Sequence, residues 1–395
     1  MTVNRHEIEH LYVHVPFCKS RCVYCDFYLE LEKHGGVSAY VDALNREIHA
    51  RFSTLKTDAL KTPLHTVYFG GGTPSLLTAS QVGEILQGIQ AFQVFASDCE
   101  ITFELNPDDA QSPLDAYLEA GINRFSVGVQ SLSNDELKKL SRRHDAQTAT
   151  QRIHDLAKCM GETANISVDL MYGIPTQSLA SWQATVQEAC DLPIQHISMY
   201  GLQLEAGTAL ETLAKKATKH YPLPSDDEHV TFYEWAVDYL AEHGFHRYEA
   251  SNFAKEGFES RHNLAYWQQK NVLAFGPSAH GYVHPTRYSV PSNLKAYTAF
   301  SQVAEITEEA VVSDVERFEN LLIFGLRLTQ VGVKASTLKE ACPSPALWRH
   351  VEGLLAEKIA QGQVEKRNDA YTLHPAWIPR MNSALCDFIG LDAPH

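Results

Sequence analysis

The chain has 395 residues, of which 44% are hydrophobic and 21% charged, and its formal net charge is −15. The length suits one large domain and a smaller one, and the acidic balance argues against a nucleic-acid partner, because phosphate binding requires a basic surface. No apolar stretch is long enough to cross a bilayer, and residues 1–10 lack a hydrophobic signal region. We therefore expect no integral membrane segment, no export and a cytoplasmic location.

Short strand-like runs recur through the first half of the chain, and each is followed by a helical pattern. Thr78 and Gln81 stand at capping-box spacing before one such helix, and residues 133–136 (SNDE) carry the same signature before another. Parallel neighbours need crossover connections, so these units predict a parallel sheet, either doubly wound or a partial barrel. The six predicted strands are 11–17, 65–70, 100–105, 124–129, 166–171 and 196–200.

The pattern changes after about residue 220. A loop is predicted to lead into a helix near 226–243, and from about residue 313 two helices precede a hairpin with its turn at Asn368–Asp369. This order predicts a winged-helix-like module, whose acidic composition favours packing or docking over DNA binding. We therefore expect three parts, namely a core (1–220), an extension of the core (221–310) and a C-terminal module (311–395).

Three of the eight cysteines, Cys18, Cys22 and Cys25, follow the pattern C-x3-C-x2-C just after the first predicted strand. The other five are scattered singly, which is typical of buried thiols in a reducing compartment. Three thiolates without a fourth ligand suit a [4Fe–4S] cluster whose last iron stays open. Structural zinc and plain buried thiols remain alternatives at this point, although zinc would favour a fourth Cys or His nearby.

A second motif, YFGGGTPS at 68–75, ends the second predicted strand with three glycines. Glycines at a strand end allow the backbone to approach a ligand, although a tight turn would also explain them. Together, the cysteine and glycine motifs resemble the radical S-adenosylmethionine superfamily. The resemblance implies an α/β fold, a partial (β/α)6 barrel, in which S-adenosylmethionine supplies the missing ligand to the open iron.

Further stretches, LYVHVPFC, ELNPDD, RFSVGVQS, DLMYGIP, RHNLAYW and GPSAHGY, resemble the oxygen-independent coproporphyrinogen oxidase-like family, and within it the HemW branch of haem chaperones. The likeness spans nearly the whole chain, including the C-terminal module. Taken singly, Glu104 and Asp169 could also be ordinary strand-end carboxylates that cap helices. The resemblance implies S-adenosylmethionine contacts at Tyr12, Gly71, Gly72, Thr73, Glu104, Gln130, Arg142, Asp169, Gln203 and His280.

Two departures separate the chain from the decarboxylating enzymes of that family. Those enzymes carry another cysteine two residues after the triad, where this chain has Phe27, and a longer N-terminal arm. The HNxxYW motif of the HemW branch, associated with haem binding, falls on His262, Tyr266 and Trp267. His and Tyr can ligate haem iron and Trp can pack on a porphyrin, although the same residues could form a structural corner.

We therefore expect a haem chaperone that depends on a [4Fe–4S] cluster and S-adenosylmethionine, carries haem as cargo and hands it to an unidentified acceptor protein, with a homodimer as one option. The alternative is a radical enzyme that decarboxylates coproporphyrinogen III or acts on another porphyrin, so enzymatic activity stays open. A zinc-structured barrel without redox chemistry is a third interpretation.

Overall fold

The computed structural model describes residues 7–32, 36–55, 57–216 and 221–391. Within these ranges, twelve strands form one sheet, in the order β14-β13-β12-β11-β1-β4-β5-β6-β7-β8-β10-β9. The six predicted strands form its parallel centre, in chain order. Their bounds are β1 (His10–Val15), β4 (Leu64–Gly71), β5 (Phe95–Leu105), β6 (Arg124–Gln130), β7 (Ile166–Tyr172) and β8 (His196–Gly201).

Strands from the later part of the chain extend this sheet on both sides. On one side, β11 lies parallel to β1, and on the other, β10 lies antiparallel to β8. The proposed extension at 221–310 thus shares the sheet of the core, and the division into three parts stays a prediction. The added strands are β9 (His246–Arg247), β10 (Asn252–Ala254), β11 (Val272–Phe275), β12 (His280–Val283), β13 (Thr286–Ser289) and β14 (Glu308–Val311).

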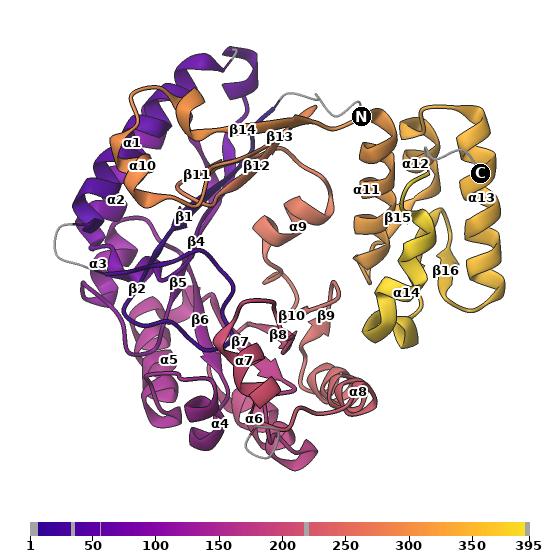
Figure 1. The fold of residues 1–395 in the computed structure, drawn as a ribbon, viewed down its shortest axis with the longest axis horizontal. Coiled ribbons are helices and arrows are strands. Elements are labelled where there is room, and N and C mark those ends of the chain that lie inside the picture. The colour runs from indigo at the N-terminus through magenta and orange to yellow at the C-terminus, as the bar shows by residue number, and fades with distance from the viewer. Residues whose placement is uncertain (1–6, 33–35, 56, 217–220, 392–395) are drawn as a thin grey trace.

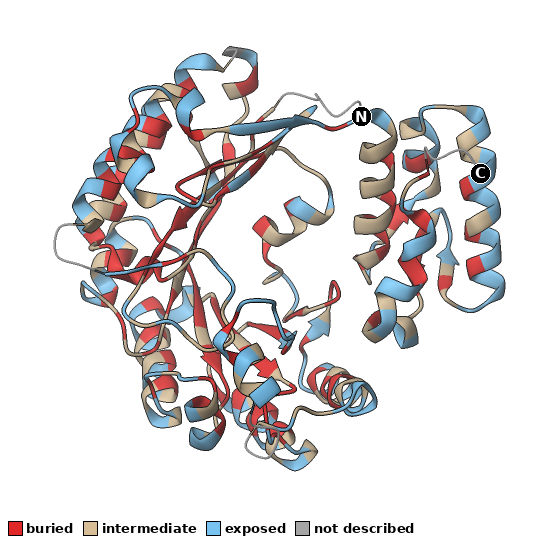
Figure 2. Cartoon of the chain, viewed as in Figure 1, coloured by how far each residue is buried: buried red, intermediate tan, exposed pale blue. Residues whose placement is uncertain are grey.

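Helices that connect the parallel strands cover the outer face of the curved sheet (Figure 1). Their buried faces point inward (Figure 2), as in α2, where Val82, Ile85 and Leu86 pack on the sheet. The capping box at Thr78 and Gln81 is confirmed. The helices of this part are α1 (Gly36–Thr54), α2 (Ala79–Gln90), α3 (Leu114–Glu119), α4 (Asn134–Lys139), α5 (Ala146–Met160), α6 (Leu179–Asp191) and α7 (Ala209–Lys216).

The second predicted capping box, at residues 133–136, is wrong. Ser133 precedes α4, but its side chain caps no backbone N–H. Glu136 instead turns inward and is 4% exposed. Its carboxylate accepts hydrogen bonds from Ser131, Gln177 and Ser181 at 2.6, 3.0 and 2.5 Å. Three donors from the neighbouring loop and helix thus outcompete the local cap.

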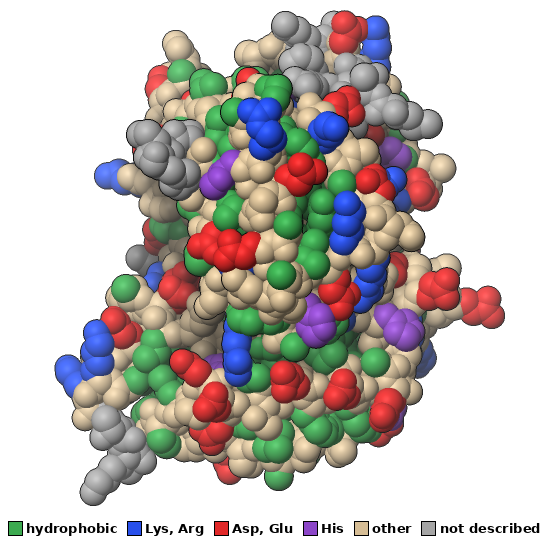
Figure 3. All heavy atoms as spheres, turned by 90° about the vertical axis from the view of Figure 1, so that its right-hand side faces the viewer, with side chains coloured by type: hydrophobic (Ala, Val, Ile, Leu, Met, Phe, Trp, Pro, Cys, Tyr) green, Lys and Arg blue, Asp and Glu red, His purple; other side chains and the backbone are tan. Residues whose placement is uncertain are grey.

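The C-terminal part has the predicted winged-helix-like character. Three further elements, β15 (Val333–Lys334), α12 (Ala335–Ala341) and α14 (Met381–Leu385), escaped the sequence analysis. The hairpin turns at Asn368, whose φ is +55°. Helix α9 (Arg261–Trp267) lies between the sheet and α11 (Asp314–Arg327) (Figure 1). Acidic and basic side chains are scattered among hydrophobic ones on the face shown in Figure 3. The elements of the C-terminal part are α11 (Asp314–Arg327), β15 (Val333–Lys334), α12 (Ala335–Ala341), α13 (Pro345–Ala360), β16 (Val364–Arg367), β17 (Ala370–Leu373) and α14 (Met381–Leu385).

The remaining helices join these parts. The predicted helix near 226–243 is α8, which opens with a capping box at Ser225 and Glu228. In the described ranges, no helix combines the length and apolar character needed to span a bilayer. These joining helices are α8 (Asp226–Glu242), α9 (Arg261–Trp267) and α10 (Leu294–Ala299).

One fully buried carboxylate, Glu47 on α1, ties the extension to the core. It accepts hydrogen bonds from Arg51 (2.7 Å), the Tyr297 hydroxyl (2.7 Å) and the Gly276 backbone N–H (2.9 Å). Glu47→Ala would leave these donors and the Arg51 charge uncompensated, so we expect a loss of about 3 kcal/mol in the free energy of unfolding. Denaturant unfolding measures it.

The control is Glu84→Ala, which removes an exposed helix carboxylate that accepts one hydrogen bond from Asn45 at 2.7 Å. We expect a change within about 0.5 kcal/mol. Equal losses in the two variants would contradict the buried tie.

Candidate functional site

A cavity of about 1240 Å³ opens at the carboxyl ends of the parallel strands. Such a position is where parallel α/β folds place their ligands. The volume exceeds the roughly 300–1,000 Å³ typical of a pocket for one drug-sized ligand, which leaves room for a second ligand. The predicted site residues that line it are Cys18, Cys22, Cys25, Gly71, Gly72, Thr73, Glu104, Gln130, Arg142, Asp169 and Gln203.

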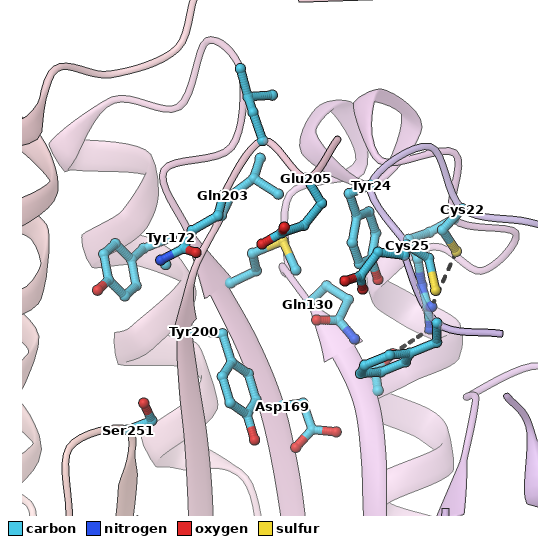
Figure 4. Close-up of a pocket in the computed structure, with 18 of the residues that line it drawn as sticks. Cys22, Tyr24, Cys25, Gln130, Asp169, Tyr172, Tyr200, Gln203, Glu205 and Ser251 are labelled. Carbon is cyan, nitrogen blue, oxygen red and sulfur yellow. Dashed lines mark hydrogen bonds between the residues drawn. The ribbon is translucent and has the colours of Figure 1, made fainter. Parts of the chain in front are cut away.

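The cysteine loop forms one wall of this cavity. Cys18 ends β2 (Phe17–Cys18), which pairs with β3 (Glu30–Leu31), and its sulfur lies 3.3 Å from the Thr73 hydroxyl. Cys22 and Cys25 lie side by side above Gln130 (Figure 4). The loop and the glycine turn, 50 residues apart in sequence, therefore face the same space.

Burial raises the pKa of the Cys18 thiol to about 11 and also raises the pKa of the Cys25 thiol. Within the described residues, no three His, Cys, Asp or Glu side chains already stand together as a metal site. Arg142 Nη1, however, lies 3.6 Å from the Cys22 sulfur, which places a cation beside the loop. Three partly buried thiols on one loop beside a cation fit a cluster of thiolate-ligated iron.

The glycine turn brings the backbone of β4 close to neighbouring segments of the same chain. Gly71 has a φ of +106°, and a Cβ there would stand 2.5 Å from the His14 ring. At Gly72 a Cβ would stand 2.7 Å from the Phe17 carbonyl oxygen. A side chain at Gly71 would displace the His14 ring on β1, and one at Gly72 would push the start of the cysteine loop away from β4. The open backbone on the cavity side therefore depends on both glycines.

Two partly buried carboxylates, Glu104 and Asp169, line the floor of the cavity. Glu104 accepts hydrogen bonds from the Tyr68 hydroxyl (2.6 Å) and from the Gly71 N–H (3.2 Å). Burial, reinforced by the neighbouring Asp169, raises the pKa of Glu104 to about 7. Burial likewise raises the pKa of Asp169 to about 6, although hydroxyls such as Ser126 donate to it. A cationic or hydroxyl-bearing ligand would therefore stabilise the ionised form of both carboxyl groups.

The side chain of Arg142 extends from the loop after α4 to the wall of the cavity that the cysteine loop forms. Its Nη2 donates to Asn106 Oδ1 and to the Gly128 carbonyl, both at 2.6 Å. Its buried Nε has no hydrogen-bond partner among the described atoms. Gln130 follows at a bulge in β6 with a φ of +68°, which turns its side chain away from the regular alternation. This end of the cavity can therefore donate to an anionic group.

Five predicted contacts lie outside the cavity lining. Tyr12 stacks between strands on Tyr68, and His280 begins the exposed end of β12. The remaining three are the HNxxYW residues on α9, which lies on the inner face of the curved sheet, between the sheet and α11 (Figure 1). The predicted residues outside the lining are Tyr12, His262, Tyr266, Trp267 and His280.

The HNxxYW corner has the geometry of a structural joint. His262 is 1% exposed, and its Nδ1 and Nε2 lie 2.8 Å from the Thr66 hydroxyl and 3.3 Å from the Tyr266 hydroxyl. Trp267 packs edge-on against Phe324 and under the Arg327 guanidinium, both on α11. The structural alternative is thus favoured for His262, whereas Tyr266 is 39% exposed and accessible.

The sequence analysis missed several residues of the cavity. Tyr24 lies within the cysteine loop, and Tyr172 and Tyr200 lie at the carboxyl ends of β7 and β8 (Figure 4), so their positions carried a signal. Residues 378–383, which bring Arg380 from the C-terminal part to the cavity, carried none, because they reach it only through tertiary docking.

Comparisons with known proteins agree with this geometry. Residues 12–189 match the family model described as the Radical SAM superfamily. The chain is 34% identical over 331 residues to the heme chaperone HemW of Bacillus subtilis, covering 80% of this chain and 83% of that protein. It is 35% identical to the mitochondrial radical S-adenosyl methionine domain-containing protein 1 of Bos taurus, covering 86% and 77%.

Among solved structures, coproporphyrinogen III oxidase (HemN) from Escherichia coli superposes with a TM-score of 0.80, at 18% identity, over 98% of this chain and 92% of that chain. At this identity the likeness shows the fold alone. It confirms the predicted partial barrel with its C-terminal module.

The glycine turn generates a stability prediction. Gly71→Ala would combine a positive φ with a clash against His14, so we expect a loss of roughly 3 kcal/mol in the free energy of unfolding. Gly161→Ala serves as the control, because Gly161 has a φ of +59° but nothing within 4 Å of an added Cβ. We expect about 1 kcal/mol there. Denaturant unfolding compares them, and similar losses would argue against close packing at Gly71.

Proposed function

Because the chain belongs to the HemW branch of the radical S-adenosylmethionine superfamily, we propose that it is a haem chaperone that binds haem and passes it to an acceptor protein. The observation that carries the proposal is the 34% identity over 80% of the chain to a protein described as a heme chaperone. The size of the cavity, about 1240 Å³, supports a second ligand beside the cofactor.

We propose that Cys18, Cys22 and Cys25 hold a [4Fe–4S] cluster, which supplies electrons and an open coordination position for S-adenosylmethionine. The chain's own groups then orient that cofactor: the bare backbone of the glycine turn admits its methionyl end, and the floor carboxylates face its cationic and hydroxyl groups. The proposed contacts are Tyr12, Gly71, Gly72, Thr73, Glu104, Gln130, Arg142, Asp169, Gln203 and His280, of which Tyr12 and His280 act from outside the cavity lining.

Phe27 favours the chaperone over the porphyrinogen-decarboxylating alternative. The side chain lines the cavity and is 60% exposed, at the position where the decarboxylating relatives are expected to carry a cysteine. An apolar ring offers no thiol for that chemistry. The acceptor protein, a cytoplasmic location and a homodimer belong to the same proposal.

The cluster proposal predicts the outcome of cysteine replacement. Alanine at position 18, 22 or 25 should abolish the brown chromophore of anaerobically reconstituted protein, which should otherwise hold about four irons per chain. Iron and sulfide analysis measures this. Cys159→Ala, at an exposed and isolated thiol, is the control and should keep the full cluster. A complete cluster in Cys22→Ala would contradict the assignment.

The raised pKa of Glu104, about 7, predicts how S-adenosylmethionine binding depends on pH. The cofactor's ammonium and sulfonium groups favour an ionised carboxylate, which prevails above that pKa and is lost below it. We therefore expect affinity to fall roughly three- to tenfold from pH 8 to pH 6, measured by calorimetry. Glu104→Gln should bind more weakly and with a flatter pH profile. An unchanged profile in that variant would place the titrating group elsewhere.

The chaperone proposal itself is tested by haem uptake. Purified protein should bind one haem with a shifted Soret band and form no protoporphyrinogen from coproporphyrinogen and S-adenosylmethionine under anaerobic conditions. If the HNxxYW motif supplies the ligand, as the sequence predicts, His262→Ala or Tyr266→Ala should lower haem occupancy while iron–sulfur absorbance and helicity persist. Steady decarboxylation by the wild-type protein would instead favour the enzyme.

A further inference from the structure

A row of aromatic side chains connects helix α9 with the cavity. The ring of Tyr68 stacks on His262 at 5.0 Å between centroids, with an interplanar angle of 27°. Tyr12 stacks on both, at 6.1 Å from Tyr68 and 6.3 Å from His262. Tyr266 meets His262 edge-on at 5.1 Å. Because interiors are close-packed, a shift of one ring displaces its neighbours.

The cavity end of this row is a single hydrogen bond. Tyr68 donates to Glu104 Oε1 at 2.6 Å, while Glu104 Oε2 accepts from the Gly71 N–H at 3.2 Å. The space around Gly70 is filled, since a Cβ there would lie 2.8 Å from the Tyr68 ring and 3.0 Å from Glu104. The Tyr68 ring therefore sets the position of the Glu104 carboxylate.

The other end of the row is held from several directions. His262 contacts the Thr66 hydroxyl at 2.8 Å, and its backbone N–H donates to Glu100 at 3.2 Å. Burial lowers the pKa of His262 to about 3, so its ring is neutral and packs as a flat, uncharged plate. The imidazole thus serves as a fixed support for the face of Tyr68.

We propose that His262 and Tyr68 are positioning residues for the S-adenosylmethionine pocket, acting through Glu104. A displacement at the HNxxYW corner is thereby transmitted to the cofactor pocket. The inference rests on the proposed function in taking Glu104 and Gly71 as cofactor contacts. It assigns to the corner a role in cofactor binding that is separate from iron ligation.

The pH profile of cofactor binding reports this role. The Tyr68 hydroxyl favours the ionised form of Glu104, whose other titratable neighbours are Asp169, Tyr12 and Tyr200. Tyr68→Phe removes that donor, so the pKa of Glu104 rises. The midpoint of S-adenosylmethionine binding should move to higher pH, an effect that a general loss of stability would not produce.

The experiment titrates S-adenosylmethionine into the cluster-loaded full chain by calorimetry between pH 6 and pH 9. Tyr68→Phe and His262→Gln should each weaken binding roughly tenfold at pH 7.5, as expected for a lost or misplaced hydrogen bond to a charged group. Tyr68→Phe should also raise the pH midpoint.

The chain offers a matched control for each variant. Tyr117→Phe removes a buried hydroxyl that donates to the Leu77 carbonyl at 2.7 Å, away from the cavity. His196→Gln replaces a buried imidazole that, like His262, is hydrogen-bonded at both ring nitrogens, to Ser167 at 2.7 Å and to Tyr248 at 2.8 Å. It lies at the amino end of β8, whereas the cavity opens at the carboxyl end. Both controls should bind S-adenosylmethionine like the wild type.

Wild-type affinity and midpoint in Tyr68→Phe and His262→Gln would overturn the inference and leave the proposed function intact. Equal losses in the controls would overturn it too, because the effect would then be general destabilisation. A wild-type protein with a full cluster and no affinity for S-adenosylmethionine would refute the proposed cofactor role itself.

Discussion

The close approach of β4 to its neighbours at residues 70–72 is the constraint on which the site depends. Each glycine makes room for a different partner: Gly70 for the Tyr68 ring, Gly71 for the His14 ring and Gly72 for the Phe17 carbonyl oxygen. With these partners in place, the cysteine loop lies against the turn, and Cys18 contacts Thr73. This glycine tripeptide thus determines the spacing between the proposed cluster and the carboxylates of Glu104 and Asp169. Only backbone without side chains fits into the narrow space between them.

The parallel centre of the sheet was predictable because each of its strands carries a local signal. The predicted bounds agree within two residues, except that β5 begins at Phe95 rather than at residue 100. Residues 97–98 there are exposed and polar, so no apolar pattern marks them. The pairing of β11 with β1 was not predictable, since the partners are some 260 residues apart in sequence and nothing local to 272–275 specifies the neighbour.

The residues of the site were predictable or not for the same reason, namely whether a local sequence signal marked them. Residues in the carboxyl-terminal halves of parallel strands, such as Glu104 and Asp169, could be assigned because strand ends of one polarity must share an edge. The C-terminal segment with Arg380 could not, because docking of a separate module brings it there. The capping box predicted at 133–136 failed for a related reason, since Glu136 accepts hydrogen bonds from Gln177 in the loop before α6 and from Ser181 in α6 instead of capping its own helix.

The corner at 262–267 bears on how haem binding would be interpreted. Tyr266 is accessible, but its hydroxyl is hydrogen-bonded to the His262 ring. Iron ligation by Tyr266 would break that hydrogen bond and free one edge of the imidazole. Because His262 supports Tyr68, and Tyr68 holds Glu104, such a change would reach the cofactor pocket. Linkage is reciprocal, so haem and S-adenosylmethionine would then alter each other's affinity by the same factor. Loss of haem binding on replacing His262 therefore does not by itself identify an iron ligand, because the same change disturbs the support of Glu104.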